Sequence, residues 1–170
     1  MANFEISIGI VLGHEGGLSN NKTDKGGLTN YGITFKLFKS YAKSLGLEPT
    51  AEVLKNISIK DAKEIYFQEF WQKMRGNEWK DQQLANIVFD AYVNMGARAI
   101  QLLQKHLGVD CDFKVGPQTL AAINSANAKL LFDSYKDARI IYYEDIVKRD
   151  STQQVFLNGW KNRVNKFVYR

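Results

Sequence analysis

The chain has 170 residues, of which 45% are hydrophobic and 24% charged, which suits one globular domain, or one domain with a short appendage. Its one cysteine, Cys111, excludes an intrachain disulfide and a zinc site built from several thiolates. The net charge of +5 favours a polyanionic partner, but the basic residues form neither a stripe nor a helix-turn-helix pattern, so we expect no nucleic-acid partner.

Apolar residues recur at helical spacing from the start of the chain. A first helix is expected over residues 4–15, and its apolar face ends in Glu15. Residues 16–32 are polar and rich in glycine, without a helical pattern, and predict a loop or a short β-hairpin. We therefore expect a mainly α fold with any β-structure confined to this stretch.

Capping residues mark several later helices. Thr34 is a candidate N-cap, Ser58 and Asp61 approximate a capping box, and Pro117 suits a first helical position. The other expected helices are a short one after Pro49 and longer ones over residues 84–95, 97–107, 127–148 and 152–168. No apolar run is long enough to span a bilayer, so we expect no integral membrane segment.

The residues that suggest chemistry lie at the end of the first helix and in the loop after it. Glu15 continues an apolar helix face and has no basic residue at helical spacing, so we expect its pKa to be raised by burial. A carboxyl that stays protonated near neutral pH can act as a general acid. Asp24 lies in the polar loop and would remain ionised as a second carboxylate, and Thr29 is a candidate for positioning a water molecule.

An ordinary structural interpretation exists for the same residues. Glu15 would then end a helix with a glycine cap, and Asp24 and the loop glycines would form a plain turn. A carboxylate is poorly placed at a helix C-terminus for electrostatic reasons, which favours the functional interpretation slightly.

The segment from Glu15 to Thr34, E-G-G-L-S-N…D-x-G-G-x-T-N-Y-G-I-T, closely resembles the opening motif of glycoside hydrolase family 108. The resemblance continues at IYFQEFW (65–71), FDAYVNMG (89–96) and LLQKHLGVDCDFKVGPQT (102–119), so it covers most of the chain in order. The family comprises N-acetylmuramidases, some described as secretion activator proteins. The resemblance implies a lysozyme-like helical fold, with the motif glutamate at Glu15.

The same segment resembles the Glu–Asp–Thr constellation of phage lysozymes. The interval from Glu15 to Asp24 agrees with that pattern, and the interval from Asp24 to Thr29 is one residue shorter. We therefore assign Glu15, Asp24 and Thr29 as catalytic candidates. The neighbouring motif residues Asn30, Tyr31 and Thr34 are candidates for substrate binding.

Asp90 and Asn94 share a helix face in the family-like segment 89–96. They either line the substrate cleft, opposite the loop of residues 16–34, or form a buried polar pair that braces the structure. Tyr31, Trp71, Trp79 and Tyr92 are suited to stacking on sugar rings, although aromatic residues in a helical protein more often belong to the core.

A later segment, Asp112–Thr119, resembles the peptidoglycan-binding motif D-G-x-x-G-P-x-T. Phe113 replaces the usual glycine, so we expect the loop to differ there. The predicted organisation is a lysozyme-like catalytic part over residues 1–107 and a peptidoglycan-binding-like helical part over 108–170 packed on it, or one single domain.

The resemblance implies a peptidoglycan hydrolase of the lysozyme type. It would cleave the β-1,4 bond between N-acetylmuramic acid and N-acetylglucosamine, with no cofactor or metal. Two alternatives remain: a non-catalytic wall-binding or secretion-assisting protein, and a lytic transglycosylase on the same fold. The N-terminus lacks a basic signal region, so we expect synthesis in the cytoplasm and, as for endolysins, action on the wall after release through a holin or another route.

Overall fold

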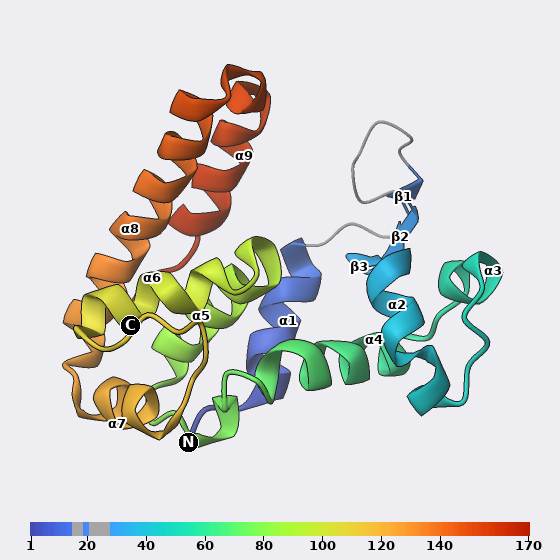
Figure 1. The fold of residues 1–170 in the computed structure, drawn as a ribbon, viewed down its shortest axis with the longest axis horizontal. Helices are drawn as coiled ribbons and strands as arrows, with labels where there is room; N and C mark the ends of the chain where they lie inside the picture. Colours follow the sequence, from blue (N-terminus) through green and yellow to red (C-terminus); the bar gives the residue numbers. More distant parts are fainter. Residues whose placement is uncertain (15–18, 21–27) are drawn as a thin grey trace. The chain divides into compact units, whose positions relative to one another are not determined.

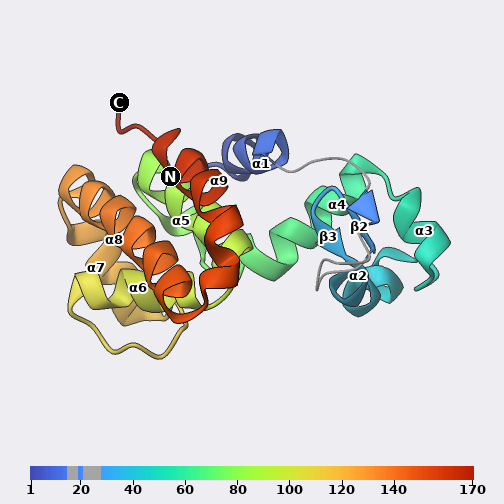
Figure 2. The same ribbon diagram turned by 90° about the horizontal axis from the view of Figure 1, so that it is seen from above.

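The computed structural model describes residues 1–14, 19–20 and 28–170. The chain divides into two compact units: one comprises Met1–Ser7 and Phe70–Arg170, and the other Ile8–Glu69. Helix α1 (Phe4–His14) contributes its first turn to the former unit and its remainder to the latter. Figures 1 and 2 show the helices and strands of each unit.

The Ile8–Glu69 unit contains a small antiparallel sheet in the order β1-β2-β3. Its strands are β1 (Ser19–Asn20), β2 (Leu28–Asn30) and β3 (Ile33–Thr34). The turn between β2 and β3 consists of Tyr31 and Gly32, with φ of 49° and 77°. Two left-handed residues are what a type I′ hairpin turn requires, so the register Asn30↔Ile33 follows from this turn.

Short helices complete this unit, and side-chain caps begin three of them, including the predicted caps Thr34 and Ser58. The Thr34 hydroxyl accepts from the Leu37 N–H at the start of α2 (Phe35–Ala42), and Thr50 does the same for α3 (Ala51–Lys55). Ser58 accepts from the Asp61 N–H at the start of α4 (Ile59–Tyr66). A 3₁₀ turn, η1 (Lys43–Leu45), follows α2.

The helical segment continues beyond α4 as a π-helical turn, η2 (Phe67–Trp71), in which the other unit begins. A 3₁₀ turn, η3 (Gly76–Glu78), leads to α5 (Gln82–Met95), where Leu84–Ala91 form an unbroken run of buried residues. The N-terminal residues are hydrogen-bonded to the segment between η3 and α5, since the Ala2 N–H donates to the Trp79 carbonyl at 2.7 Å. The Ser7 hydroxyl donates to Asn86 Oδ1, also at 2.7 Å.

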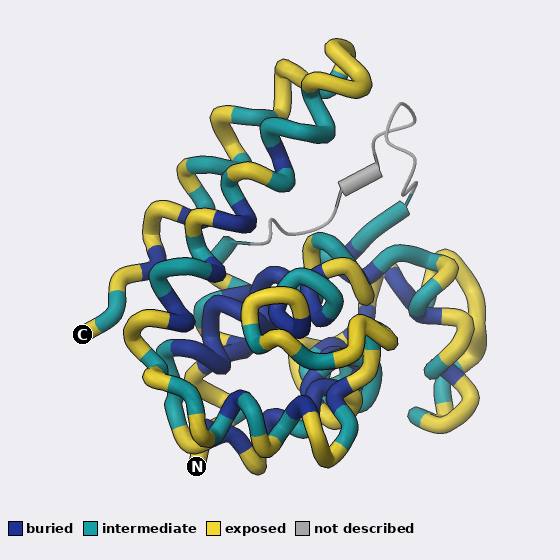
Figure 3. The backbone as a smooth tube through the Cα atoms, turned by 60° about the vertical axis from the view of Figure 1, so that its left-hand side comes forward, coloured by how far each residue is buried: buried dark blue, intermediate teal, exposed yellow. Residues whose placement is uncertain are grey.

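Four helices follow α5 in the same unit: α6 (Arg98–Leu107), α7 (Pro117–Ser125), α8 (Ala128–Arg149) and α9 (Gln154–Asn165). Helices α8 and α9 run side by side as an antiparallel pair connected by a 3₁₀ turn, η4 (Ser151–Gln153) (Figures 1 and 2). Exposed residues gather where α8 turns into α9, and buried residues lie toward the opposite end of the pair (Figure 3).

The prediction of a mainly α fold with a small β-region is confirmed. In the described ranges, the helix predicted to begin at the Ser58 cap changes to a π-helical turn at Phe67, and the C-terminal helix covers 154–165 instead of 152–168. No helix in these ranges is long and apolar enough to cross a membrane. The predicted division at residue 107 stays a prediction, while the compact units divide within α1 and near Phe70.

The loop before α7 keeps a glycine-like backbone at Phe113. This residue has φ of 67°, in the left-handed region that glycine adopts without steric cost. Gln104 holds the loop: its Oε1 accepts from the Phe113 N–H at 3.0 Å, and its Nε2 donates to Asp112 at 2.7 Å. The hydrogen bond from Gln104 and another from the Lys114 N–H stabilise the charged carboxylate of Asp112 and lower its pKa. Phe113 thus adopts the backbone region typical of the glycine it replaces, and the expectation that it changes the rest of the loop stays a prediction.

We expect Phe113→Gly to raise the free energy of unfolding by about 1 kcal/mol, because it removes a side chain from a left-handed backbone position. The contact of Arg98 with the Phe113 ring, at 5.5 Å, is lost and reduces the gain. Gly108→Ala is the opposite change at another left-handed residue, with φ of 66°, and should destabilise the chain. Urea unfolding measures both variants, and a Phe113→Gly protein less stable than wild type would contradict the strain at this residue.

Candidate active site

Two of the three catalytic candidates, Glu15 and Asp24, lie outside the described residues, and their roles stay predictions. The third, Thr29, is in the middle of β2 and pairs with Ser19 on one side and Thr34 on the other. Helix α1 ends at His14, directly before Glu15, and Asp24 belongs to the sequence between β1 and β2.

Asn30 is used to join the sheet to α3. The residue is buried, and its Nδ2 donates to the carbonyl oxygens of Leu54 at 3.1 Å and Lys55 at 2.9 Å. These carbonyls belong to the last turn of α3, where a helix leaves acceptors unsatisfied. The contacts favour a bracing role for the Asn30 amide, and its predicted substrate contact stays a prediction.

Tyr31 is the first residue of the turn that follows β2, and Thr34 is the last residue of β3. Tyr31 is half-buried and has a positive φ, which is unusual for an aromatic residue, and the Tyr66 hydroxyl donates to its carbonyl at 2.8 Å. Thr34 uses its hydroxyl to cap α2. The fold thus fixes the backbone of Tyr31. The Thr34 side chain is used as a helix cap, whereas the Tyr31 ring is not.

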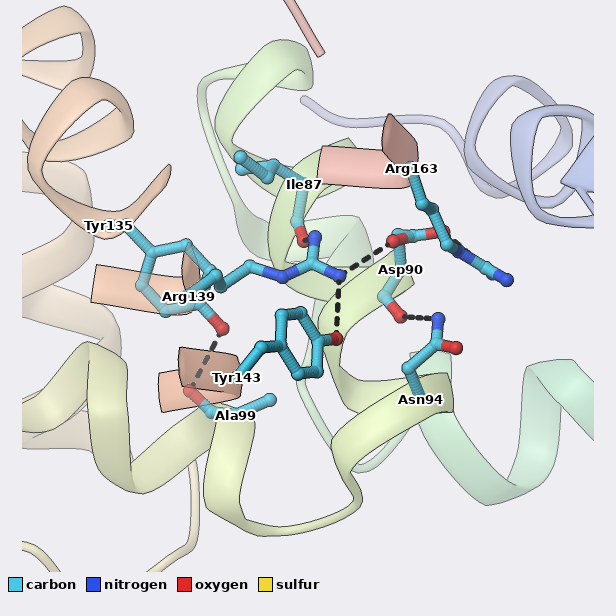
Figure 4. Close-up of polar contacts among 8 residues, drawn as sticks. All are labelled: Ile87, Asp90, Asn94, Ala99, Tyr135, Arg139, Tyr143 and Arg163. Atoms are coloured by element: carbon cyan, nitrogen blue, oxygen red, sulfur yellow. Dashed lines mark hydrogen bonds and ion pairs between the residues drawn. The ribbon is translucent and has the colours of Figure 1, made fainter. Parts of the chain in front are cut away.

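Asp90, on α5, is completely buried and paired with two arginines (Figure 4). One carboxylate oxygen lies 2.9 Å from Nη2 of Arg139 on α8, and the other accepts from Nε of Arg163 on α9 at 3.0 Å. The Arg163 Nη2 is also 2.9 Å from that second oxygen. Since both oxygens are engaged by guanidinium groups, these contacts favour the bracing alternative for Asp90 over substrate binding.

The surroundings of Arg139 explain why a guanidinium can remain charged inside the unit. The side chain is wholly buried, donates to the Ile87 carbonyl at 3.2 Å and lies 3.4 Å from the Tyr143 hydroxyl. Burial acts to lower the pKa of Arg139, but the charge of Asp90 and the neighbouring tyrosines outweigh it, so the net pKa is raised. For a tyrosine, burial disfavours the charged phenolate and so raises the pKa. This is the case for Tyr135, whose hydroxyl donates to the Ala99 carbonyl.

Asn94 is exposed one turn after Asp90 on α5, and its Nδ2 donates to the Asp90 carbonyl at 2.8 Å. Its Oδ1 remains for a ligand, so its substrate-binding role stays a prediction. Trp71 and Trp79 are completely buried, which places them in the core. Within residues 1–14, 19–20 and 28–170, no group of three or more acidic, histidine or cysteine side chains is arranged to hold a metal ion.

Arg139 and Arg163 are the important side chains of this region that the sequence analysis did not identify as partners of Asp90. They lie 49 and 73 residues away along the chain. The sequence offered only weak signals for these contacts: two basic residues on predicted helices and one aspartate in an apolar run.

Comparison with known proteins decides the family. A family model described as glycosyl hydrolase 108 matches residues 8–96, and one described as a predicted peptidoglycan domain matches residues 98–165. The chain belongs to the glycosyl hydrolase 108 family. A solved structure, that of Brucella abortus SagA, is 30% identical, with a TM-score of 0.82 over 96% of this chain and 90% of that chain. No curated protein matches this chain.

The family assignment confirms the resemblance inferred from the motifs and supports a lysozyme-like helical fold. The chain is a glycoside hydrolase by family, and its C-terminal segment is peptidoglycan-binding-like. The glycosyl hydrolase 108 match includes the Glu15–Thr34 motif and α5 with Asp90, whereas Arg139 and Arg163 lie in the peptidoglycan match. The buried ion pairs therefore connect the two matched segments within one compact unit.

We expect Arg139→Met to lower the free energy of unfolding by about 3 kcal/mol or more, because it removes a buried partner of a buried carboxylate. The matched control is Lys148→Met on the same helix, since Lys148 pairs with Asp145 but is 71% exposed. An exposed pair contributes at most about 1 kcal/mol. Chemical denaturation compares the two variants. Equal losses would contradict the cost assigned to leaving the buried Asp90 carboxylate without Arg139.

Proposed function

We propose that the protein is an N-acetylmuramidase that hydrolyses the β-1,4 bond between N-acetylmuramic acid and N-acetylglucosamine in peptidoglycan. The observation that carries the proposal is the order of the two family matches. A glycosyl hydrolase segment that contains the Glu15–Asp24–Thr29 motif is followed directly by a peptidoglycan segment. One chain thus combines the residues for glycosidic bond cleavage with a segment suited to holding the polymer.

Glu15 is proposed as the general acid that protonates the glycosidic oxygen of the leaving sugar. Leaving-group protonation is needed because a sugar hydroxyl is a poor leaving group as an alkoxide. Asp24 would orient the attacking water or stabilise the oxocarbenium-like centre, and Thr29 would help to position the water. Thr29 is suited to this by its place in β2, where pairing on both sides fixes its backbone.

Substrate contacts are proposed for the side chains that the fold leaves available near the motif and on α5. The ring of Tyr31 would stack on a sugar, and the Asn94 Oδ1 would accept from a sugar hydroxyl. Neither role requires a cofactor. Release to the wall through a holin or a similar route, as in an endolysin, is a proposal that rests on the same activity, whereas assistance of secretion belongs to the non-catalytic alternative.

Two other functions are distinguished by the chemistry. A wall-binding protein without activity would have no use for a protonated carboxyl at Glu15, which supports catalysis. A lytic transglycosylase would use the same acid but close the muramic acid ring onto itself instead of adding water. The second carboxylate at Asp24, available to handle a water molecule, supports hydrolysis.

We expect Glu15→Gln to abolish the clearing of purified peptidoglycan while wall binding and the thermal midpoint are retained. Glutamine keeps the shape of the side chain but cannot deliver a proton, and general acid catalysis contributes about 10²–10⁴-fold. Turbidity of a wall suspension measures lysis, and co-sedimentation with the wall measures binding. The matched control is Glu5→Gln, the same change in the first turn of α1.

Wild-type clearing by the Glu15→Gln protein would contradict the general-acid role of Glu15. A wild-type protein that binds the wall but releases no sugar fragments would instead support the non-catalytic alternative. Both proteins are melted in parallel, so that loss of folding is separated from loss of chemistry.

A further inference from the structure

A hollow of about 560 Å³ lies on the peptidoglycan-matched segment, at the junction of α6, α7 and α8. This volume is within the range of small-ligand sites, about 300–1,000 Å³. The hollow is lined by His106, Leu107, Ala122, Ser125, Ala126, Asn127, Leu130, Leu131 and Ser134. Leu130 is 67% exposed, which is unusual for a leucine inside a hollow and leaves an apolar surface for a ligand.

The lining is apolar with a neutral polar rim. Five of its members are leucine or alanine, and none of the nine described members is an aspartate, glutamate, lysine or arginine. Lys129 is adjacent in sequence, but it pairs with Asp133 at 2.6 Å. The hollow therefore has no fixed cation of its own with which to hold a carboxylate.

The rim offers mainly hydrogen-bond acceptors. The hydroxyls of Ser125 and Ser134 donate to backbone carbonyls, so their oxygens remain able to accept. His106 Nδ1 lies 2.8 Å from the Leu102 carbonyl and must donate to it, so Nε2 is the ring atom that can accept when the imidazole carries one proton. Asn127 accepts from the Leu130 N–H through Oδ1, and its Nδ2 can donate.

We propose that this hollow binds a neutral N-acetylated sugar of the glycan strand, a proposal that rests on the proposed peptidoglycan substrate. Sugar hydroxyls are donors that match the three acceptors, and an acetamido carbonyl matches the Asn127 amide. The acetyl methyl and the C–H face of the ring match Leu130 and its apolar neighbours. The stem peptides of peptidoglycan carry carboxylates, which are acceptors and find no cation among the described lining residues.

The test uses ¹⁵N-labelled Glu15→Gln protein, which is not expected to turn over the sugar, titrated with tri-N-acetylchitotriose and separately with a soluble stem pentapeptide. We expect saturable shifts of the His106, Ser125 and Leu130 amide resonances with the sugar and none with the peptide. Leu130→Glu should weaken sugar binding at these resonances at least tenfold. It should not unfold the chain, because residue 130 is exposed and in the first turn of α8, where an acidic side chain is favourable.

The matched control is Ile141→Glu, since Ile141 is 54% exposed on the same helix but outside the hollow. It should leave the affinity within twofold of the parent. Leu130→Lys provides a second discrimination, because it should weaken binding of a neutral sugar but strengthen binding of a carboxylate.

Peptide shifts without sugar shifts, no saturable shift at these resonances, or unchanged affinity in Leu130→Glu would each overturn the proposal. Wall clearing by the wild-type protein is measured alongside. Sugar binding in the hollow without clearing would count against the proposed hydrolase function and leave this site standing.

Discussion

The buried pairing of Asp90 with Arg139 and Arg163 is the interaction on which the unit of Met1–Ser7 and Phe70–Arg170 depends. It joins α5 to both α8 and α9. The side chains of Asp90 and Arg139 are completely buried, and that of Arg163 is 16% exposed. Buried ion pairs contribute little net stability compared with apolar packing, but an unmatched buried charge is costly. The cluster therefore favours one arrangement of these helices. An arrangement of α8 and α9 that left Asp90 without guanidinium groups would be strongly disfavoured.

This constraint changes how the two family segments are understood. The glycosyl hydrolase match ends at residue 96 and the peptidoglycan match begins at 98, as if two domains followed each other. The compact unit instead combines α5, from the first match, with all the helices of the second. Asp90 lies in one matched segment and its two arginines lie in the other. Neither matched segment therefore contains the complete Asp90 cluster.

Local signals in the sequence predicted much of the fold. Thr34 and Ser58 cap their helices because a side-chain oxygen satisfies a nearby N–H, an interaction that depends only on neighbours in the chain. The pairing of Asp90 could not be found in this way, since its partners are distant in sequence. The π-helical turn at Phe67 was also missed, because its residues continue the same apolar pattern as the α-helix before it.

The candidate site was predicted from its motif rather than from contacts. Glu15, Asp24 and Thr29 were selected by residue type and spacing, and the family match supports the segment that contains them. Individual roles were harder to assign. Asn30 is a motif residue, yet its amide is used to hold α3, because one side chain can serve a motif and a helix end at once.

Hydrolysis of the glycan strand is tested by mass spectrometry of the fragments that the protein releases from purified peptidoglycan. We expect fragments that end in a reducing N-acetylmuramic acid, which has gained the elements of water. Fragments that end in 1,6-anhydro-N-acetylmuramic acid, or in reducing N-acetylglucosamine, would contradict it.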